Sequence, residues 1–195
     1  MTDTEFDRQV ATYVAAGFGE DLPQRLEPLR SAFASAEAGD LPPVVVLKRE
    51  TIGAERMVAD IDRDDGVPET FITAEALTVY AEREGVSLPE GEAYVIAGVS
   101  KEPATRNVAP GEALKSIAEA GRSPLTIEEG LAVWRQFPDV IAVNNGLSLA
   151  ASTRGDKRVP AIWISKKRPK LGWCFFGVPH TWLATASLSS RIGAD

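Results

Sequence analysis

The sequence predicts an α+β fold in which a mixed or antiparallel sheet ends in a C-terminal antiparallel meander and helices pack on one face. Three observations predict it. Apolar residues recur at helical spacing through residues 1–40, two short apolar runs at 44–48 and 92–100 have the length of buried strands, and four strand-like runs follow closely over 147–188. The chain has 195 residues, of which 44% are hydrophobic and 25% charged, so we expect a single domain.

Two helices are expected in the N-terminal part, residues 1–40. The first apolar face begins at Phe6 and ends before Gly17. The second pattern covers 22–33 but contains Pro28, which lacks a backbone N–H and clashes with the preceding turn. This helix is therefore expected either to be kinked or to begin at Pro28.

The middle of the chain alternates strand and helix signals. The β-branched run 44–48 predicts a buried strand, and 55–61 is expected to return beside it as a hairpin. A helix is expected over 74–84, followed by the strand 92–100 and a short helix over 110–121, where Pro110 suits the first helical position.

The clearest helix start is Thr126-Ile-Glu-Glu129, a capping box in which each of two side chains accepts a hydrogen bond from the other residue's backbone N–H. After the Asn144-Asn145-Gly146 turn, short basic turns separate the four strand-like runs, so we expect these runs to be antiparallel neighbours. Trp163 alternates with Ile162 and Ile164, which favours a central strand covered on both faces. The four runs are 147–153, 159–165, 171–177 and 182–188.

Charge is distributed unevenly along the chain, whose formal net charge is −7. Residues 1–129 hold 25 acidic and 12 basic side chains, whereas residues 130–195 hold 3 and 9. We expect the two parts to attract each other. The first ten residues contain no apolar run, and the single cysteine excludes an internal disulfide, so we expect a cytoplasmic protein with no signal peptide and no membrane anchor.

Several stretches resemble an uncharacterised family. The segments SPLTIEEG from Ser123, NNG from Asn144, RVPAIWIS, PKLGWC and HTWL are similar to those of a domain-of-unknown-function family of actinobacterial proteins, most strongly over residues 123–187. The resemblance implies a bacterial cytoplasmic origin. It implies no catalytic residue, because that family has no assigned activity.

Cys174 and His180 are the only thiol and imidazole, and a catalytic cysteine needs a base such as histidine to form its thiolate. Cys174 stands in the apolar run GWCFFG, however, where a lone cysteine is more often a small buried hydrophobe. We therefore favour a structural thiol and keep the pair as catalytic candidates.

Two charged stretches have weaker functional interpretations. Asp60, Asp62 and Asp64 resemble part of a calcium loop, but Phe71 occupies the place of the bidentate glutamate, so we interpret the stretch as an acidic turn. The basic turns 154–158 and 166–170, interleaved with tryptophans, suggest nucleic-acid binding. They flank opposite ends of one strand, and so we do not expect a nucleic-acid partner.

We expect a binding or interaction protein with an unknown protein or small-molecule partner, and neither metal nor cofactor. Its binding residues are expected at the loop ends of the C-terminal strands. One alternative is a small enzyme that uses Cys174 and His180, with Arg154 or Arg158 positioning an anionic substrate; a second is nucleic-acid binding through the basic turns. The candidate binding residues are Asn144, Asn145, Arg154, Arg158, His180 and Trp182.

Overall fold

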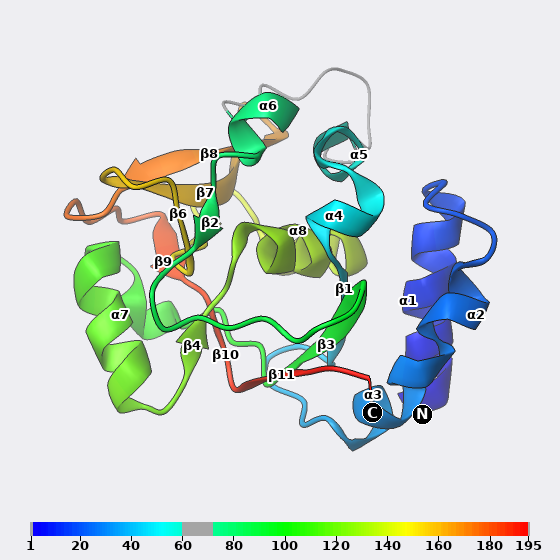
Figure 1. Ribbon diagram of the computed structural model, residues 1–195. Coiled ribbons are helices and arrows are strands. Elements are labelled where there is room, and N and C mark those ends of the chain that lie inside the picture. The colour runs from blue at the N-terminus through cyan, green and yellow to red at the C-terminus, as the bar shows by residue number, and fades with distance from the viewer. Residues whose placement is uncertain (1, 60–71, 195) are drawn as a thin grey trace.

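The computed structural model describes residues 2–59 and 72–194 and combines helices with small, mainly antiparallel sheets, which confirms the α+β class (Figure 1). The helices in these residues are α1 (Thr2–Ala15), α2 (Leu22–Leu26), α3 (Arg30–Ser35), α4 (Arg49–Ile52), α5 (Ala54–Ala59), α6 (Ala74–Leu77), α7 (Pro110–Glu119) and α8 (Ile127–Gln136), with 3-10 turns η1 (Glu27–Leu29), η2 (Pro103–Thr105) and η3 (Pro138–Val140). The strands are β1 (Val44–Leu47), β2 (Ala81–Glu82), β3 (Ala93–Ala97), β4 (Ser123–Pro124), β5 (Gly146–Ser148), β6 (Ser152–Thr153), β7 (Arg158–Ser165), β8 (Arg168–Phe175), β9 (Leu183–Thr185), β10 (Ser187–Leu188) and β11 (Ser190–Ile192).

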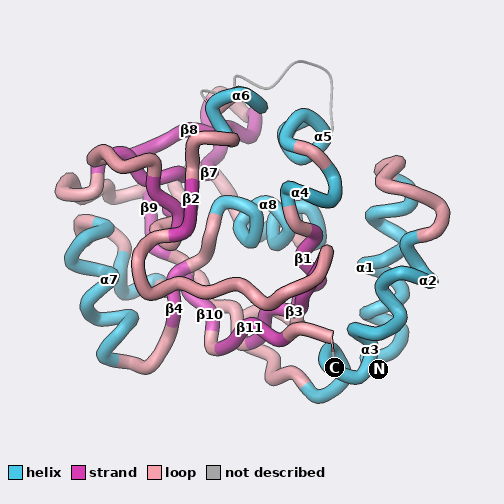
Figure 2. The backbone as a smooth tube through the Cα atoms, viewed as in Figure 1, coloured by secondary structure: helices cyan, strands magenta, loops and turns pink. Residues whose placement is uncertain are grey.

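The N-terminal helices α1, α2 and α3 lie together at one side of the molecule (Figures 1 and 2). Pro28 lies in η1 between α2 and α3, so the second predicted helix is kinked there. The rings of Phe6 and Phe33 meet edge to face with centroids 5.4 Å apart, which joins α1 to α3. The helices of this part thus lie within residues 2–35.

A three-stranded antiparallel sheet of order β1-β3-β11 separates two apolar clusters. Val45 faces α1, whose Tyr13 hydroxyl donates to the Val45 carbonyl at 2.8 Å. Val44 and Val46 pack on the opposite side with α8. The sheet is therefore covered on both faces, whereas the sequence predicts helices on one face. Consecutive apolar residues in β1 and β3 are the physical reason, because a half-exposed sheet would alternate apolar and polar residues.

The helix α8 is buried along its whole length and lies between the two larger sheets (Figure 1). Its capping box is present as expected: the Thr126 hydroxyl accepts from Glu129 N, and the Glu129 carboxylate accepts from Thr126 N. Gly130 allows close packing, since a Cβ at this position would lie 2.2 Å from a methyl carbon of Leu149.

The second large sheet has the order β8-β7-β5-β9. The hairpin β7–β8 is antiparallel and β7 has a neighbour on each side, as expected for a central strand. The last run differs from the sequence prediction, because β9 pairs parallel with β5 at the other edge of the sheet and not with β8. The following residues then join other sheets, β10 with β4 and β11 with β3.

Two predictions in the middle of the chain are wrong. The hairpin of 44–48 with 55–61 does not form: β1 pairs with β3, and 54–59 is helical because Ala, Glu, Arg and Met are strong helix formers. The helix predicted over 74–84 ends at Leu77, and β2 pairs with β6 instead. The β-branched residues Thr78 and Val79 follow the helix end and disfavour its continuation.

Candidate functional site

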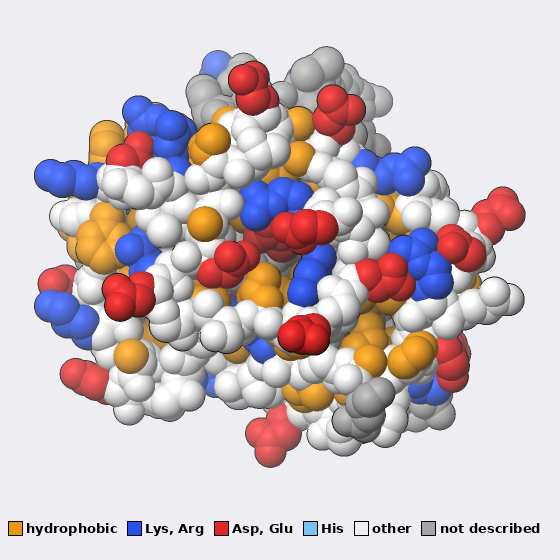
Figure 3. Space-filling view, viewed as in Figure 1, with side chains coloured by type: hydrophobic (Ala, Val, Ile, Leu, Met, Phe, Trp, Pro, Cys, Tyr) orange, Lys and Arg blue, Asp and Glu red, His pale blue; other side chains and the backbone are white. Residues whose placement is uncertain are grey.

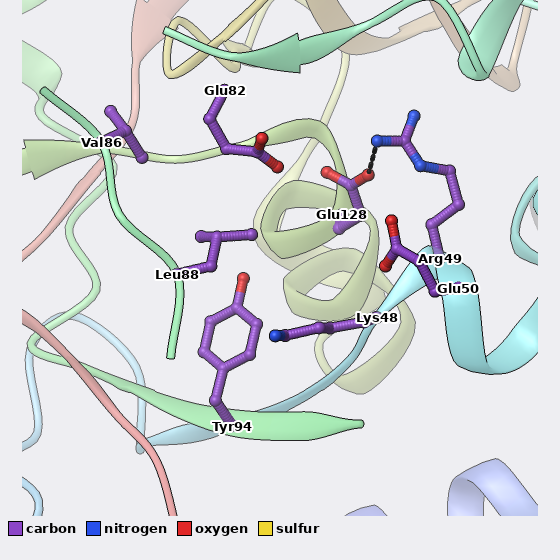
Figure 4. A pocket seen from close by; sticks show the side chains of 8 residues that line it. All are labelled: Lys48, Arg49, Glu50, Glu82, Val86, Leu88, Tyr94 and Glu128. Atoms are coloured by element: carbon purple, nitrogen blue, oxygen red, sulfur yellow. Dashed lines mark ion pairs between the residues drawn. The ribbon is translucent and has the colours of Figure 1, made fainter. Parts of the chain in front are cut away.

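A pocket of about 230 Å³ opens where the ends of β1 and β3 meet α4, β2 and the start of α8 (Figure 4). We call it the charged pocket. On this side of the molecule, acidic and basic side chains gather near the middle of the surface (Figure 3). The residues that line the pocket are Lys48, Arg49, Glu50, Glu82, Val86, Leu88, Tyr94 and Glu128.

The cationic side of the pocket comes from the junction of β1 and α4. The backbone N–H of Lys48 donates to the Glu92 carbonyl at 3.0 Å, which continues the β1–β3 pairing by one residue before α4 begins at Arg49. The Lys48 ammonium donates to the carbonyl of Pro89. The Arg49 guanidinium donates to the Leu77 carbonyl at 2.5 Å and forms an ion pair with Glu128. Both cationic side chains thus already donate hydrogen bonds to backbone carbonyl groups of the protein.

Glu128 is the most deeply buried charged residue in the pocket lining. It is the second residue of α8, and only 6% of its side chain is exposed. Its Oε1 lies 3.1 Å from Nη2 of Arg49, while its other oxygen points into the pocket (Figure 4). Burial raises the pKa of Glu128, and the negative charge of Glu82 adds to this, against the opposing effect of Arg49.

Tyr94 lines the pocket and is held in place by Glu129, which does not itself line it. The Tyr94 hydroxyl donates to Glu129 Oε1 at 3.0 Å, and Arg191 donates to both oxygens of the same carboxylate at 2.6 and 2.9 Å. Burial, followed by the charge of Glu129, raises the pKa of Tyr94, so this phenol keeps its proton. The second glutamate of the capping box therefore anchors the wall, whereas Glu128 faces the open space.

The remaining lining residues divide into unpaired acids and an apolar wall. Glu50 and Glu82 have no side-chain hydrogen bond or ion pair to any other described residue. Val86 and Leu88 supply apolar surface beside Glu82 and across from Arg49 and Glu128 (Figure 4). The pocket thus offers free carboxylate acceptors next to an aliphatic surface.

The thiol of Cys174 lies in an apolar cluster with Val159, Ala161 and Leu183. Burial raises its pKa to about 12, which disfavours a thiolate at neutral pH. Among the described residues no hydrogen bond links Cys174 to His180, whose ring instead contacts Trp182 with centroids 5.3 Å apart. These findings weigh against the catalytic interpretation of the pair.

The structure brings together some of the other predicted binding residues. The backbone N–H of Gly146 donates to the Trp182 carbonyl at 2.8 Å, so the 144–146 turn lies beside the 179–182 loop. Asn145 accepts a hydrogen bond from Arg106 at 2.5 Å, and Asn144 is exposed with a φ of 60°.

Arg154 and Arg158 lie at another position, where both approach the carboxylate of Asp156, at 3.3 and 3.8 Å. None of these predicted residues lines the charged pocket. The residues Asp60, Asp62 and Asp64 lie outside the described residues.

The sequence does not predict the charged pocket, although two of its features point toward it. A Lys-Arg-Glu triplet directly follows the buried strand 44–47, and charged residues at the end of a buried strand often surround a site. The capping box contains two adjacent glutamates, of which the cap needs only Glu129. What brings Glu82 to the same place is the pairing of β2 with β6, for which the sequence has no local signal.

None of the helices in the described residues is long and apolar enough to span a membrane. Among known proteins, no curated protein and no solved structure matches the chain. One family model does match, over residues 9–194, and its description is a family of unknown function, DUF5701. The match contains both the charged pocket and the segment 123–187 on which the expected family resemblance rests. The chain therefore belongs to the DUF5701 family.

Proposed function

We propose that this protein binds a small molecule in the charged pocket. The observation that carries the proposal is the Glu128 carboxylate, which is nine-tenths buried and directs one oxygen into the pocket. Burying a carboxylate without full pairing costs several kcal/mol, and such groups cluster at functional sites. A ligand that contacts the second oxygen of Glu128 would add a partner to the one that Arg49 supplies.

A screen with a pocket-filling variant tests this proposal. Leu88→Trp places a large side chain in the pocket without changing its charge, and Val178→Trp is the matched control because Val178 is 43% exposed and lies outside the pocket. Compounds from a metabolite collection that raise the melting temperature of the wild type should also stabilise the control and fail with Leu88→Trp. An equal shift in all three proteins would place binding elsewhere, and no shift with any compound would contradict the proposal.

Catalysis by Cys174 and His180 is the alternative that the sequence leaves open. The buried thiol should react with a disulfide reagent only when the protein unfolds, because its pKa is raised to about 12. Labelling of the native protein should therefore be far slower than labelling in denaturant. Rapid labelling at neutral pH, lost in His180→Ala, would restore the catalytic interpretation.

Single-stranded nucleic acid is a second candidate ligand, favoured by two exposed rings on β8. Trp173 and Phe175 are 37% and 46% exposed, with ring centroids 5.2 Å apart, and bases stack on such surfaces. Asp156 weakens this candidate because it pairs with both nearby arginines. If the surface binds an oligothymidylate, fluorescence anisotropy titrations should show that the affinity falls steeply as the salt concentration rises. The affinity should also fall steeply in Trp173→Ala. A flat salt response would dismiss it.

A further inference from the structure

We propose that the charged pocket takes a small organic cation, whose positive group lies between the carboxylates of Glu82 and Glu128. This inference rests on the small-molecule binding proposed above and names the chemistry of the ligand. It begins from an imbalance in the pocket lining. Lys48 and Arg49 already donate to the Pro89 and Leu77 carbonyls, whereas Glu82 has no partner among the described residues.

The position of the cation follows from how the acids face each other. The carboxylates of Glu82 and Glu128 point toward one another across the pocket, although they come from β2 and α8 (Figure 4). Their mutual repulsion contributes to the raised pKa of Glu128. A cation placed between them replaces this repulsion by two charge-assisted contacts, while Arg49 stays on the far oxygen of Glu128.

Size and surroundings favour an organic cation over a metal ion. No three acidic, histidine or cysteine side chains in the described part of the chain converge closely enough to ligate a metal. The volume of about 230 Å³ is below the roughly 300–1,000 Å³ of pockets for drug-sized ligands. Leu88 and Val86 present an aliphatic wall next to the acids. An ammonium or guanidinium group on a short aliphatic body fits these features.

Binding of such a cation should depend on the protonation of Glu128. A protonated Glu128 offers no charge to the ligand, so affinity should fall as the pH is lowered through its raised pKa. The charged and titratable groups around Glu128 come from its own helix and from each neighbouring element: they are Lys48, Arg49, Glu50, Glu82, Tyr94, Glu129 and Arg135.

The test uses compounds of equal length and different charge. Nuclear magnetic resonance titrations of the full chain compare n-butylammonium and butylguanidinium with 1-butanol and butyrate, up to about 50 mM, which covers millimolar dissociation constants. The two cations should shift the amide signals of residues 48–50, 82, 88 and 128, while butanol and butyrate should not. Glu82→Gln should weaken cation binding by up to about fivefold, since Glu82 is exposed and ion pairs of exposed side chains are weak. Glu84→Gln, an exposed acid on the same segment outside the pocket, should leave it unchanged.

A pH series completes the test, because an alkylammonium keeps its charge from pH 8 down to about 5. Wild-type affinity should fall as the pH is lowered through the raised pKa of Glu128, and the weaker affinity of Glu128→Gln should stay flat. Binding of butyrate in the pocket without binding of the cations would overturn the inference but leave small-molecule binding intact. Absence of cation binding, or equal binding by Glu82→Gln, would also overturn it, and the metabolite screen decides separately on the proposed function.

Discussion

At the scale of single residues, the neighbouring glutamates of α8 have opposite surroundings. Glu129 is fully buried, and its two oxygens accept from Tyr94, Arg191 and the Thr126 backbone. Glu128 is buried nearly as deeply but has one charged partner, Arg49. The difference explains why Glu129 can serve the fold, whereas Glu128 is the residue that we propose contacts a ligand.

Replacing Glu128 by glutamine should change how stability depends on pH. Because burial raises the pKa of Glu128 above its value in the unfolded chain, the folded state favours the protonated carboxyl, and this contribution is lost as the pH rises through the folded pKa. Glutamine resembles the protonated form at every pH. The free energy of unfolding of Glu128→Gln minus that of the wild type should therefore increase from pH about 4.5 upward. Urea titrations at several pH values measure this difference, and a decrease with pH would contradict the inferred direction.

At the scale of secondary structure, the sequence predicts those elements whose signals are local. The capping box at Thr126 and the helices α1 and α7 form as expected, because caps and apolar periodicity act within a few residues. The pairing of β1 with β3 joins residues 46 to 52 positions apart, and the parallel pairing of β9 with β5 requires the chain to pass from β8 at one edge of the sheet to the other edge. No local pattern predicts such pairings, and for this reason the charged pocket, which needs β2, β3 and α8 together, could not be predicted either.

The contact of α8 with the segment after β5 gives a prediction at this scale. Gly130→Ala should destabilise the protein by about 1–3 kcal/mol, because the new methyl group would overlap the side chain of Leu149. Gly177→Ala is the matched control, since an added Cβ meets no atom within 4 Å there. Urea unfolding measures both variants. Adding Leu149→Ala to Gly130→Ala should cost less than the sum of the two changes, and strict additivity would refute the overlap.

At the scale of the whole molecule, Arg191 joins the basic C-terminal part of the chain to the acidic N-terminal part. It extends from β11 and contacts Glu129 of α8 together with Ser123 and the Pro124 carbonyl of β4. The predicted attraction between the two parts therefore includes a buried ion pair, with side chains 8% and 0% exposed. One guanidinium thus holds the edge strand, the central helix and the segment that precedes it.

Removing this guanidinium should be costly. Arg191→Ala leaves the Glu129 carboxylate buried with neutral donors alone, and the loss of one member of a buried pair typically costs about 3–5 kcal/mol. Adding Glu129→Gln should recover part of this loss, because the buried charge is removed. Chemical unfolding of the single and double variants tests both statements. A loss below about 1 kcal/mol for Arg191→Ala would show that the pair adds little to stability.

The strands β9, β10 and β11 follow one another along residues 183–192, yet each joins a different sheet. Releasing this segment would remove an edge strand from each of the two larger sheets and would separate the two-stranded sheet of β10 and β4. Exchange of the backbone amides with deuterium in these sheets should then proceed through one shared opening reaction. Pairing of residues 183–192 closes long loops, and we therefore expect it to be a slow and late step in folding. A pocket built from strands and helices joined in this way should hold its shape until the molecule unfolds as a unit.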